Sequence, residues 1–101
     1  MTTVLKKLAS GTLGTSSSTL YTVPASTKTI VKSIILCNKT SSDKYATITF
    51  AGTDVIYQHT VKAKDTLVVQ MTAILEASAT IAGLAEAADT IGYYISGIEV
   101  V

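Results

Sequence analysis

The 101-residue sequence predicts an all-β protein: an antiparallel β-sandwich, jelly-roll-like or Ig-like, with seven to eight short strands and a flexible N-terminal arm. Three observations lead to this prediction. Apolar and polar residues alternate over several short stretches, these stretches are rich in β-branched residues, and polar turns separate them about every 8–12 residues. Spacing of this kind is typical of antiparallel sandwiches and small barrels.

Residues 1–19 are predicted to form an N-terminal arm and hinge, and residues 20–101 a single β-sandwich domain. Within the arm, "TVLKKLA" (3–9) fits either a short strand or a flexible segment. The next stretch, "SGTLGTSSS" (10–18), has the glycine, serine and threonine content of a loop or hinge. Arms of this kind often become ordered against a neighbouring molecule.

Two strands joined by a corner follow the arm. "TLYTV" (19–23) is predicted to be a short strand that ends at Pro24, because proline has no N–H to donate to a ladder. "KTIVKSIILCN" (28–38) is the strongest strand in the chain. Strict alternation places Ile30, Ile34 and Leu36 on one face and Val31, Ile35 and Cys37 on the other. A strand that is apolar on both faces is covered on both, or on one of them by another subunit.

The middle of the chain predicts a hairpin and one further strand. "YATITFAG" (45–52) alternates cleanly, with Ala46, Ile48 and Phe50 on its buried face. "TDVIYQHTV" (53–61) follows as its hairpin partner, and a turn over 62–65 leads into "TLVVQM" (66–71).

The last third of the chain contains an ambiguous stretch, residues 72–90. Its alanine content and the three- and four-residue recurrence of apolar positions fit a helix, but Ser78, Thr80 and Gly83 interrupt it. We favour two short strands, "AILEA" and "ATIAG", and an alanine-rich loop; a single helix is the alternative. In the final strand, 90–101, the apolar face changes at Gly97, which indicates a β-bulge or a strand that passes from one sheet to another.

Composition excludes several classes of partner. The net charge is +1, all eight basic residues are lysines, and the charged fraction is only 15%. Arginine is the usual reader of phosphate and guanine, so we expect no nucleic acid partner. No apolar stretch approaches the roughly 18 residues of a membrane span, and no signal peptide is evident, so we expect no membrane insertion.

No residue of the sequence qualifies as a catalytic, cofactor-binding or metal-binding site. His59 and Cys37 are each the only residue of their type, the carboxylates are scattered among predicted turns, and the glycines do not form a phosphate-binding motif. We therefore expect no cofactor and no enzymatic activity.

Tyrosine supplies five of the six aromatic residues. Tyr45 shares an outward face with Thr47 and Thr49, and the adjacent Tyr93 and Tyr94 point to opposite faces, so that one of them faces solvent or a partner. Exposed tyrosine and threonine suit contact with a protein or a sugar, and the alternative is cross-strand packing within the sheet.

Residues 11–101 resemble a family of small tailed-bacteriophage virion proteins. The resemblance rests on "LYTVPA" (20–25), "VKSI" (31–34), a strand that ends in "CN" (37–38), "LEASATI" (75–81) and "ISGIEV" (95–100). These motifs are structural rather than catalytic. The sequence departs from the family's commoner "VPAGK" turn, because it has "VPASTK", with serine in place of glycine.

The resemblance implies a β-sandwich displayed on a phage particle as a head-decoration, head-fibre or tail-associated protein. We expect a non-enzymatic virion protein that is made in the host bacterial cytoplasm and binds the particle surface through self-association and the N-terminal arm. Its expected partners are copies of itself, in a homotrimer or another closed homo-oligomer, and phage major capsid or tail proteins. The alternative is a tail-associated or receptor- or carbohydrate-binding module that uses its exposed tyrosines.

Overall fold

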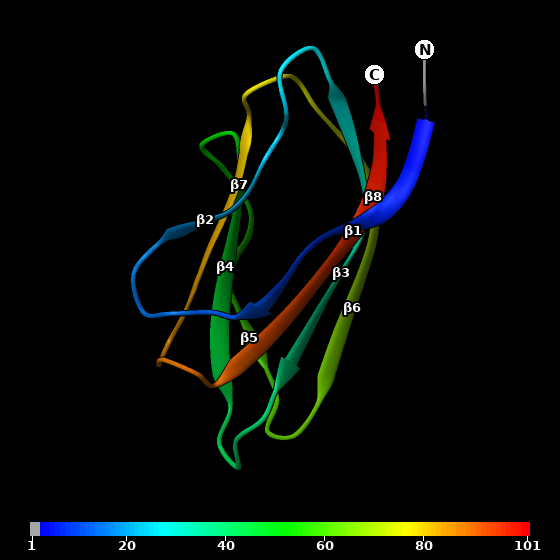
Figure 1. Ribbon diagram of the computed structural model, residues 1–101. Coiled ribbons are helices and arrows are strands. Elements are labelled where there is room, and N and C mark those ends of the chain that lie inside the picture. Colours follow the sequence, from blue (N-terminus) through cyan, green and yellow to red (C-terminus); the bar gives the residue numbers. More distant parts are fainter. Residues whose placement is uncertain (1–2) are drawn as a thin grey trace.

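The computed structural model describes residues 3–101, which form eight strands and no helix (Figure 1). The strands are β1 (Thr3–Thr12), β2 (Ser18–Thr22), β3 (Lys28–Asn38), β4 (Lys44–Phe50), β5 (Thr53–Val61), β6 (Thr66–Leu75), β7 (Thr80–Ala85) and β8 (Ile91–Val100). All of their pairings are antiparallel. The predicted all-β class is confirmed.

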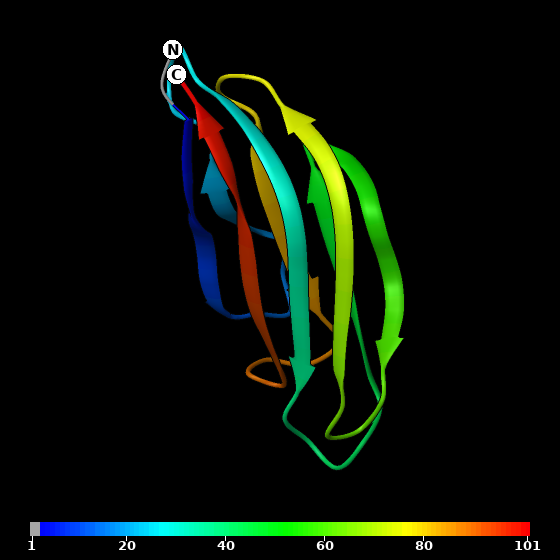
Figure 2. The same ribbon diagram turned by 90° about the vertical axis from the view of Figure 1, so that its right-hand side faces the viewer.

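The strands form two four-stranded sheets (Figure 2). Sheet A has the order β1-β8-β3-β6, and sheet B has the order β2-β7-β4-β5. The hydrogen-bonded pairs are nested along the chain: first with last, second with seventh, third with sixth and fourth with fifth. A long antiparallel hairpin rolled around its own axis gives this arrangement, which is the jelly roll. Of the two predicted sandwich types, the structure has the jelly roll and not the Ig-like order.

The core lies between the two sheets and is built almost entirely from aliphatic side chains. Its fully buried members come from every part of the chain: Leu13, Val23, Val31, Ile34, Leu36, Ala46, Ile48, Ile81, Ile91 and Ile95. In β4 the buried residues include Ala46, Ile48 and Phe50, as the alternation predicts. No buried side-chain nitrogen or oxygen lacks a hydrogen-bond partner among residues 3–101.

The predicted N-terminal arm is part of the sandwich from residue 3 onward. β1 pairs with β8 along its whole length, so of the two alternatives for residues 3–9 the structure has the strand and not the flexible segment. The predicted hinge is also anchored, because Leu13 is buried and its N–H donates to the Ile91 carbonyl. Residues 1 and 2 lie outside the described part of the chain.

The ambiguous stretch 72–90 contains strands, and the helix alternative is wrong. The first expected strand, residues 73–77, is the end of β6 rather than a separate element, and it stops at Leu75. Ser78 takes a left-handed conformation, φ 69°, in the turn that leads into β7. The alanine-rich loop follows β7 and ends before Ile91.

The predicted irregularity at Gly97 lies in the neighbouring strands and not in β8 itself. β8 stays in sheet A throughout, so the expectation that it passes between sheets is wrong. The register shifts by one residue at Lys32 in β3, opposite Gly97 and Ser96, and at Leu8 in β1, opposite Ser96 and Ile95. Both bulges sit side by side across the sheet.

The bulge at Lys32 changes which residues of β3 face the core. Val31, Ile34 and Leu36 are fully buried, and Ile30, Ile35 and Cys37 lie on the outer side. Strict alternation placed Ile30 on one face with Ile34 and Leu36, and Val31 on the other with Ile35 and Cys37; this was wrong, because the extra residue between Val31 and Ser33 reverses the parity.

Gly97 is required by the close approach of β3. A β-carbon at this position would overlap the carbonyl oxygen of Ile30 and touch the side chain of Leu8. We expect Gly97→Ala to lower the free energy of unfolding by about 2–4 kcal/mol, because a backbone atom cannot rotate away. Denaturant unfolding measures the change.

Gly14→Ala is the matched control, because a β-carbon there meets nothing within 4 Å. Its effect should stay within about 1 kcal/mol. Equal effects of the two substitutions would contradict the close approach at Gly97.

Candidate interaction surface

The outer face of sheet A carries an apolar row that crosses all four strands. The cross-strand register pairs Leu5 with Ile98, Ile98 with Ile30, and Ile30 with Ile74. Leu5 and Ile74, at the two edges, are 77% and 63% exposed. Neighbouring β-branched and aliphatic side chains on one sheet face contact each other, so the four residues form one continuous band.

A second outward row, made mostly of apolar and aromatic side chains, lies further along the same four strands. Tyr94 pairs with Ile35, and Ile35 pairs with Val68. Tyr94 and Val68 are both about half exposed, and Ser10 completes the row at the β1 edge. The outward residue of the adjacent tyrosine pair is therefore Tyr94, while Tyr93 packs against the core.

A narrow polar row separates the two apolar rows. It consists of Lys7, Ser96, Ser33 and Gln70, aligned by the same register. The hydroxyls of Ser33 and Ser96 are 2.7 Å apart and hydrogen-bonded to each other. One hydrogen bond thus ties β3 to β8 in the central part of this row.

The only charged side chains on this face are lysines. Among the outward positions of the four strands as described, these are Lys7, Lys28 and Lys32. Lys32 donates to Thr72 Oγ1 at 3.3 Å, and Lys28 lies 3.8 Å from the Glu76 carboxylate in a largely exposed ion pair. Apolar patches larger than a few hundred Å² are uncommon on monomers and mark interaction sites. We call this surface, with its three rows, the outer face of sheet A.

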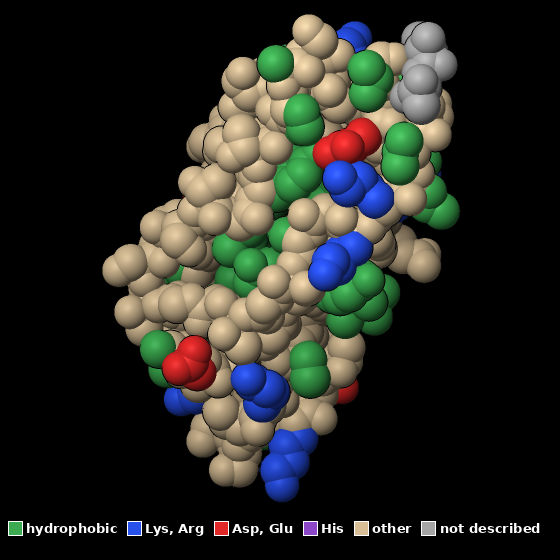
Figure 3. All heavy atoms as spheres, in the orientation of Figure 1, with side chains coloured by type: hydrophobic (Ala, Val, Ile, Leu, Met, Phe, Trp, Pro, Cys, Tyr) green, Lys and Arg blue, Asp and Glu red, His purple; other side chains and the backbone are tan. Residues whose placement is uncertain are grey.

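The outer face of sheet B differs in character. Its outward positions include Thr19, Thr22, Thr49 and Thr60, and its largest exposed apolar side chains, Val55 and Tyr57, lie on the edge strand β5. Tyr45 is only half exposed, and its backbone N–H donates to Glu86. Figure 3 shows the side of the molecule with β1 and β2, where acidic and basic side chains lie in contact near one end and most of the surface between the charges is uncharged.

A polar network joins the two sheets at one end of the core. Tyr21 of β2 donates its hydroxyl hydrogen to the Glu99 carboxylate of β8, and Thr29 of β3 lies 2.9 Å from the same hydroxyl oxygen. Since the Tyr21 hydrogen is used, Thr29 must be the donor in the second bond. Lys6 completes the network through an ion pair of 3.3 Å with Glu99. Burial raises the pKa of Tyr21 to about 12, and the bond to Glu99 adds to the rise.

Asn38 organises the opposite end of the core. Its side chain is fully buried, and its amide nitrogen donates to the carbonyls of Ser42 and Val61 at 2.8 and 2.9 Å. Its amide oxygen accepts from the N–H and the hydroxyl of Thr40. Asn38 thus holds the β3–β4 turn against the end of β5.

The remaining reactive residue types do not assemble into a catalytic or metal site. His59 is exposed on β5, and Cys37 is half-buried on the outer side of β3. Among residues 3–101, no group of three or more His, Cys, Asp or Glu side chains could hold a metal ion. Those residues also contain no helix, and hence none long and apolar enough to cross a membrane.

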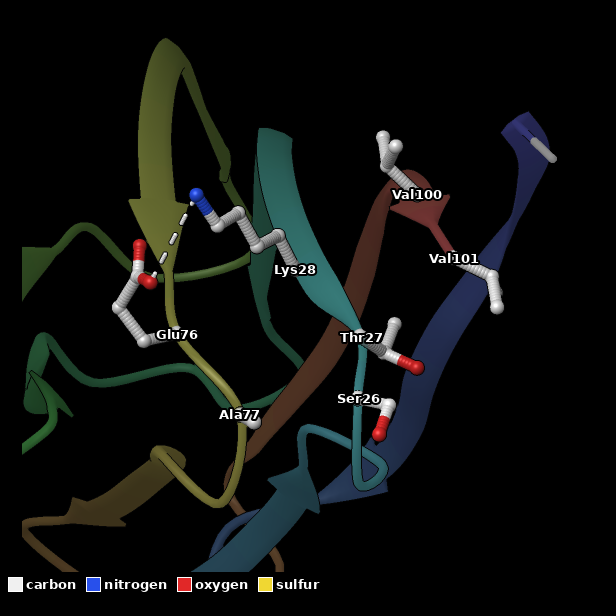
Figure 4. A pocket seen from close by; sticks show the side chains of 7 residues that line it. All are labelled: Ser26, Thr27, Lys28, Glu76, Ala77, Val100 and Val101. Carbon is white, nitrogen blue, oxygen red and sulfur yellow. Dashed lines mark ion pairs between the residues drawn. The ribbon is translucent and has the colours of Figure 1, made fainter. Parts of the chain in front are cut away.

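A shallow pocket of about 280 Å³ opens near the C-terminal end of β8 (Figure 4). It is lined by Ser26, Thr27, Lys28, Glu76, Ala77, Val100 and Val101. Its one ion pair, between Lys28 and Glu76, is mostly exposed, and such pairs contribute at most about 1 kcal/mol. The one buried polar side chain in its lining, Thr27, already donates its hydroxyl hydrogen to the Ala25 carbonyl.

No protein-family model matches the chain, and no curated protein matches it with significant similarity.

The Tyr21 hydroxyl gives stability a dependence on alkaline pH. With a folded-state pKa of about 12 and an unfolded one of about 10, its contribution is complete below pH 10 and is lost as the pH rises through 12. At pH 8 we expect Tyr21→Phe to cost about 1–2 kcal/mol of unfolding free energy, through its lost hydrogen bonds. The gap between wild type and variant should shrink between pH 10 and 12 in denaturant unfolding; a constant gap would contradict the network.

The fold should be destabilised when the hydrogen-bond donor of the buried Asn38 side chain is replaced by an acceptor. Asn38→Asp keeps the shape but turns the group that donates to the Ser42 and Val61 carbonyls into a carboxylate oxygen. We expect a loss of about 2–4 kcal/mol at pH 7, measured by denaturant unfolding. The loss should lessen at low pH, where the carboxyl is protonated and can donate again. A variant of wild-type stability would show that these hydrogen bonds are not formed.

Proposed function

We propose that the protein is a non-enzymatic structural component of a bacteriophage virion, a capsid-decoration or head-associated protein that binds the particle surface and copies of itself. The observation that carries the proposal is the outer face of sheet A, with its two apolar rows and no carboxylate among the described outward positions. A surface of this kind is stabilised by burial against another protein, at about 25 cal/mol per Å² before the costs of association.

The sequence resemblance supports the viral setting of this proposal. "LYTVPA" covers the end of β2 and the start of the turn that joins β2 to β3, "VKSI" lies within β3, and "ISGIEV" covers the second half of β8, which pairs with β3 along its whole length. Two of these three motifs therefore fall on β3 and β8, the central strands of sheet A. Because residues 3–12 are a strand of the sandwich, the proposal gives no attachment role to a free N-terminal arm.

The alternative function is a tail-associated or receptor- or carbohydrate-binding module. It is favoured by Tyr57, which is 66% exposed and lies near Val55 on the edge strand β5. An exposed aromatic ring on a sheet edge suits contact with a sugar or a peptide. This surface lies on sheet B, so the two functions use different sides of the molecule.

Purified phage particles test the proposal. We expect mass spectrometry to detect the chain in many copies per particle, and immunogold electron microscopy to place it on the head. Ile74→Ser should reduce its occupancy severalfold, whereas Tyr57→Ala should leave occupancy unchanged. Absence from the particles would refute the virion role; labelling confined to the tail, with host attachment lost in Tyr57→Ala, would favour the alternative.

A further inference from the structure

We propose that the outer face of sheet A binds the same face of a second copy, and that a two-fold axis runs along the seam between β8 and β3. This inference rests on the proposed self-association and specifies its surface and symmetry. In such an isologous pair, if residue i of one copy meets residue j of the other, then j of the first copy also meets i of the second, so the face must complement itself.

The edges of both sheets argue that copies meet through faces. Each of the four edge strands carries a register irregularity: β1 at Leu8, β2 at Leu20, β5 near Gln58 and β6 between Gln70 and Ala73. Irregular edges present a poor template for further strand pairing. A sheet built from two copies edge to edge is therefore disfavoured, and an apolar face is left for contact.

The size of the face matches what a stable pair needs. Four strands about 4.8 Å apart, each about ten residues long at roughly 3.3 Å per residue, present roughly 600 Å² per copy. Two such faces bury roughly 1,200 Å², which is the lower limit of specific, stable interfaces.

Chemical matching selects the direction of the axis. Rotation about the β8–β3 seam places β8 of one copy over β3 of the other and keeps each row over the same row. Ile98 then meets Ile30, Ser96 meets Ser33, and Tyr94 meets Ile35 across the interface, following the order of strands in the sheet. Packed sheets usually cross at about 30°, so the match is closest at these two central strands.

The edge strands complete the match without opposing like charges. β1 lies over β6 of the other copy, so that Leu5 meets Ile74 and Lys7 meets Gln70. An axis perpendicular to the strands would instead place each strand over its own counterpart. Lys7 would then oppose Lys7, and Lys32 would oppose Lys32, with no carboxylate nearby on the face, which costs binding free energy.

Sedimentation equilibrium of the purified chain tests the face. We expect a concentration-dependent dimer whose dissociation constant rises about tenfold or more in Ile74→Ser, because an apolar side chain is lost from the contact. Val55→Ser is the matched control: Val55 is also an exposed β-branched residue on an edge strand, but it lies on sheet B. A chain that stays monomeric at high concentration, or equal effects of the two substitutions, would overturn the proposal.

Charge substitutions at Gln70 test the axis. If Lys7 of one copy lies opposite Gln70 of the other, Gln70→Glu should tighten the dimer about two- to fivefold. Gln70→Lys should weaken it by a similar factor. The double variant Lys7→Glu with Gln70→Lys should restore binding. Within one copy the two residues lie on opposite edge strands, about 14 Å apart, so a coupling between them cannot arise inside the chain.

The perpendicular axis predicts a different result. It brings Gln70 close to Gln70 of the other copy, so both charge substitutions should weaken the dimer; that outcome would overturn the proposed symmetry. Thermal melts of every variant, followed by circular dichroism, confirm that the sandwich is folded. Occupancy on phage particles is scored separately, so a failure of the dimer is distinguishable from a failure of the virion role.

Discussion

The antiparallel pairing of β3 with β8 is the interaction on which the rest of the structure depends. On the inner side it joins Ile34 to Ile95 at the centre of the core, and on the outer side it joins Ile30 to Ile98 at the centre of the apolar row. The approach is close enough that only glycine fits at position 97. One pairing, between segments far apart in the chain, thus determines both the interior and the surface available to a partner.

Local patterns predicted most of the strands but not every strand's buried face. The alternation of apolar and polar residues in 45–50 correctly predicted the inner side of β4, because the irregularities of its pairing with β5 insert their extra residues in β5 and not in β4. In β3 the same reasoning failed at Ile30 and Val31. The bulge at Lys32 that reverses them is determined by Gly97 and Leu8 on other strands, and no local pattern reports it.

The existence of an apolar interaction surface could be predicted from the sequence, but not how far it extends across the sheet. The apolar character of both faces of 28–38 predicted that one of them needs cover, yet the row from Leu5 to Ile74 exists only once the cross-strand register is known. The two polar networks were not predicted, because their members come from distant segments: Tyr21 meets Glu99, and Asn38 meets Val61. For the Asn38 network the only local signal was an asparagine at the end of a predicted strand.

Both ends of the described chain leave the sandwich at the same pole (Figures 1 and 2). The turns 39–43, 62–65 and 86–90 lie together at the other pole, where Lys39 N–H bonds to the Thr90 carbonyl and Lys64 N–H to that of Thr40. The molecule is 46 Å long. A polypeptide fused to either end would therefore emerge at one pole, and a peptide grafted into the far turns would be held a full molecular length away.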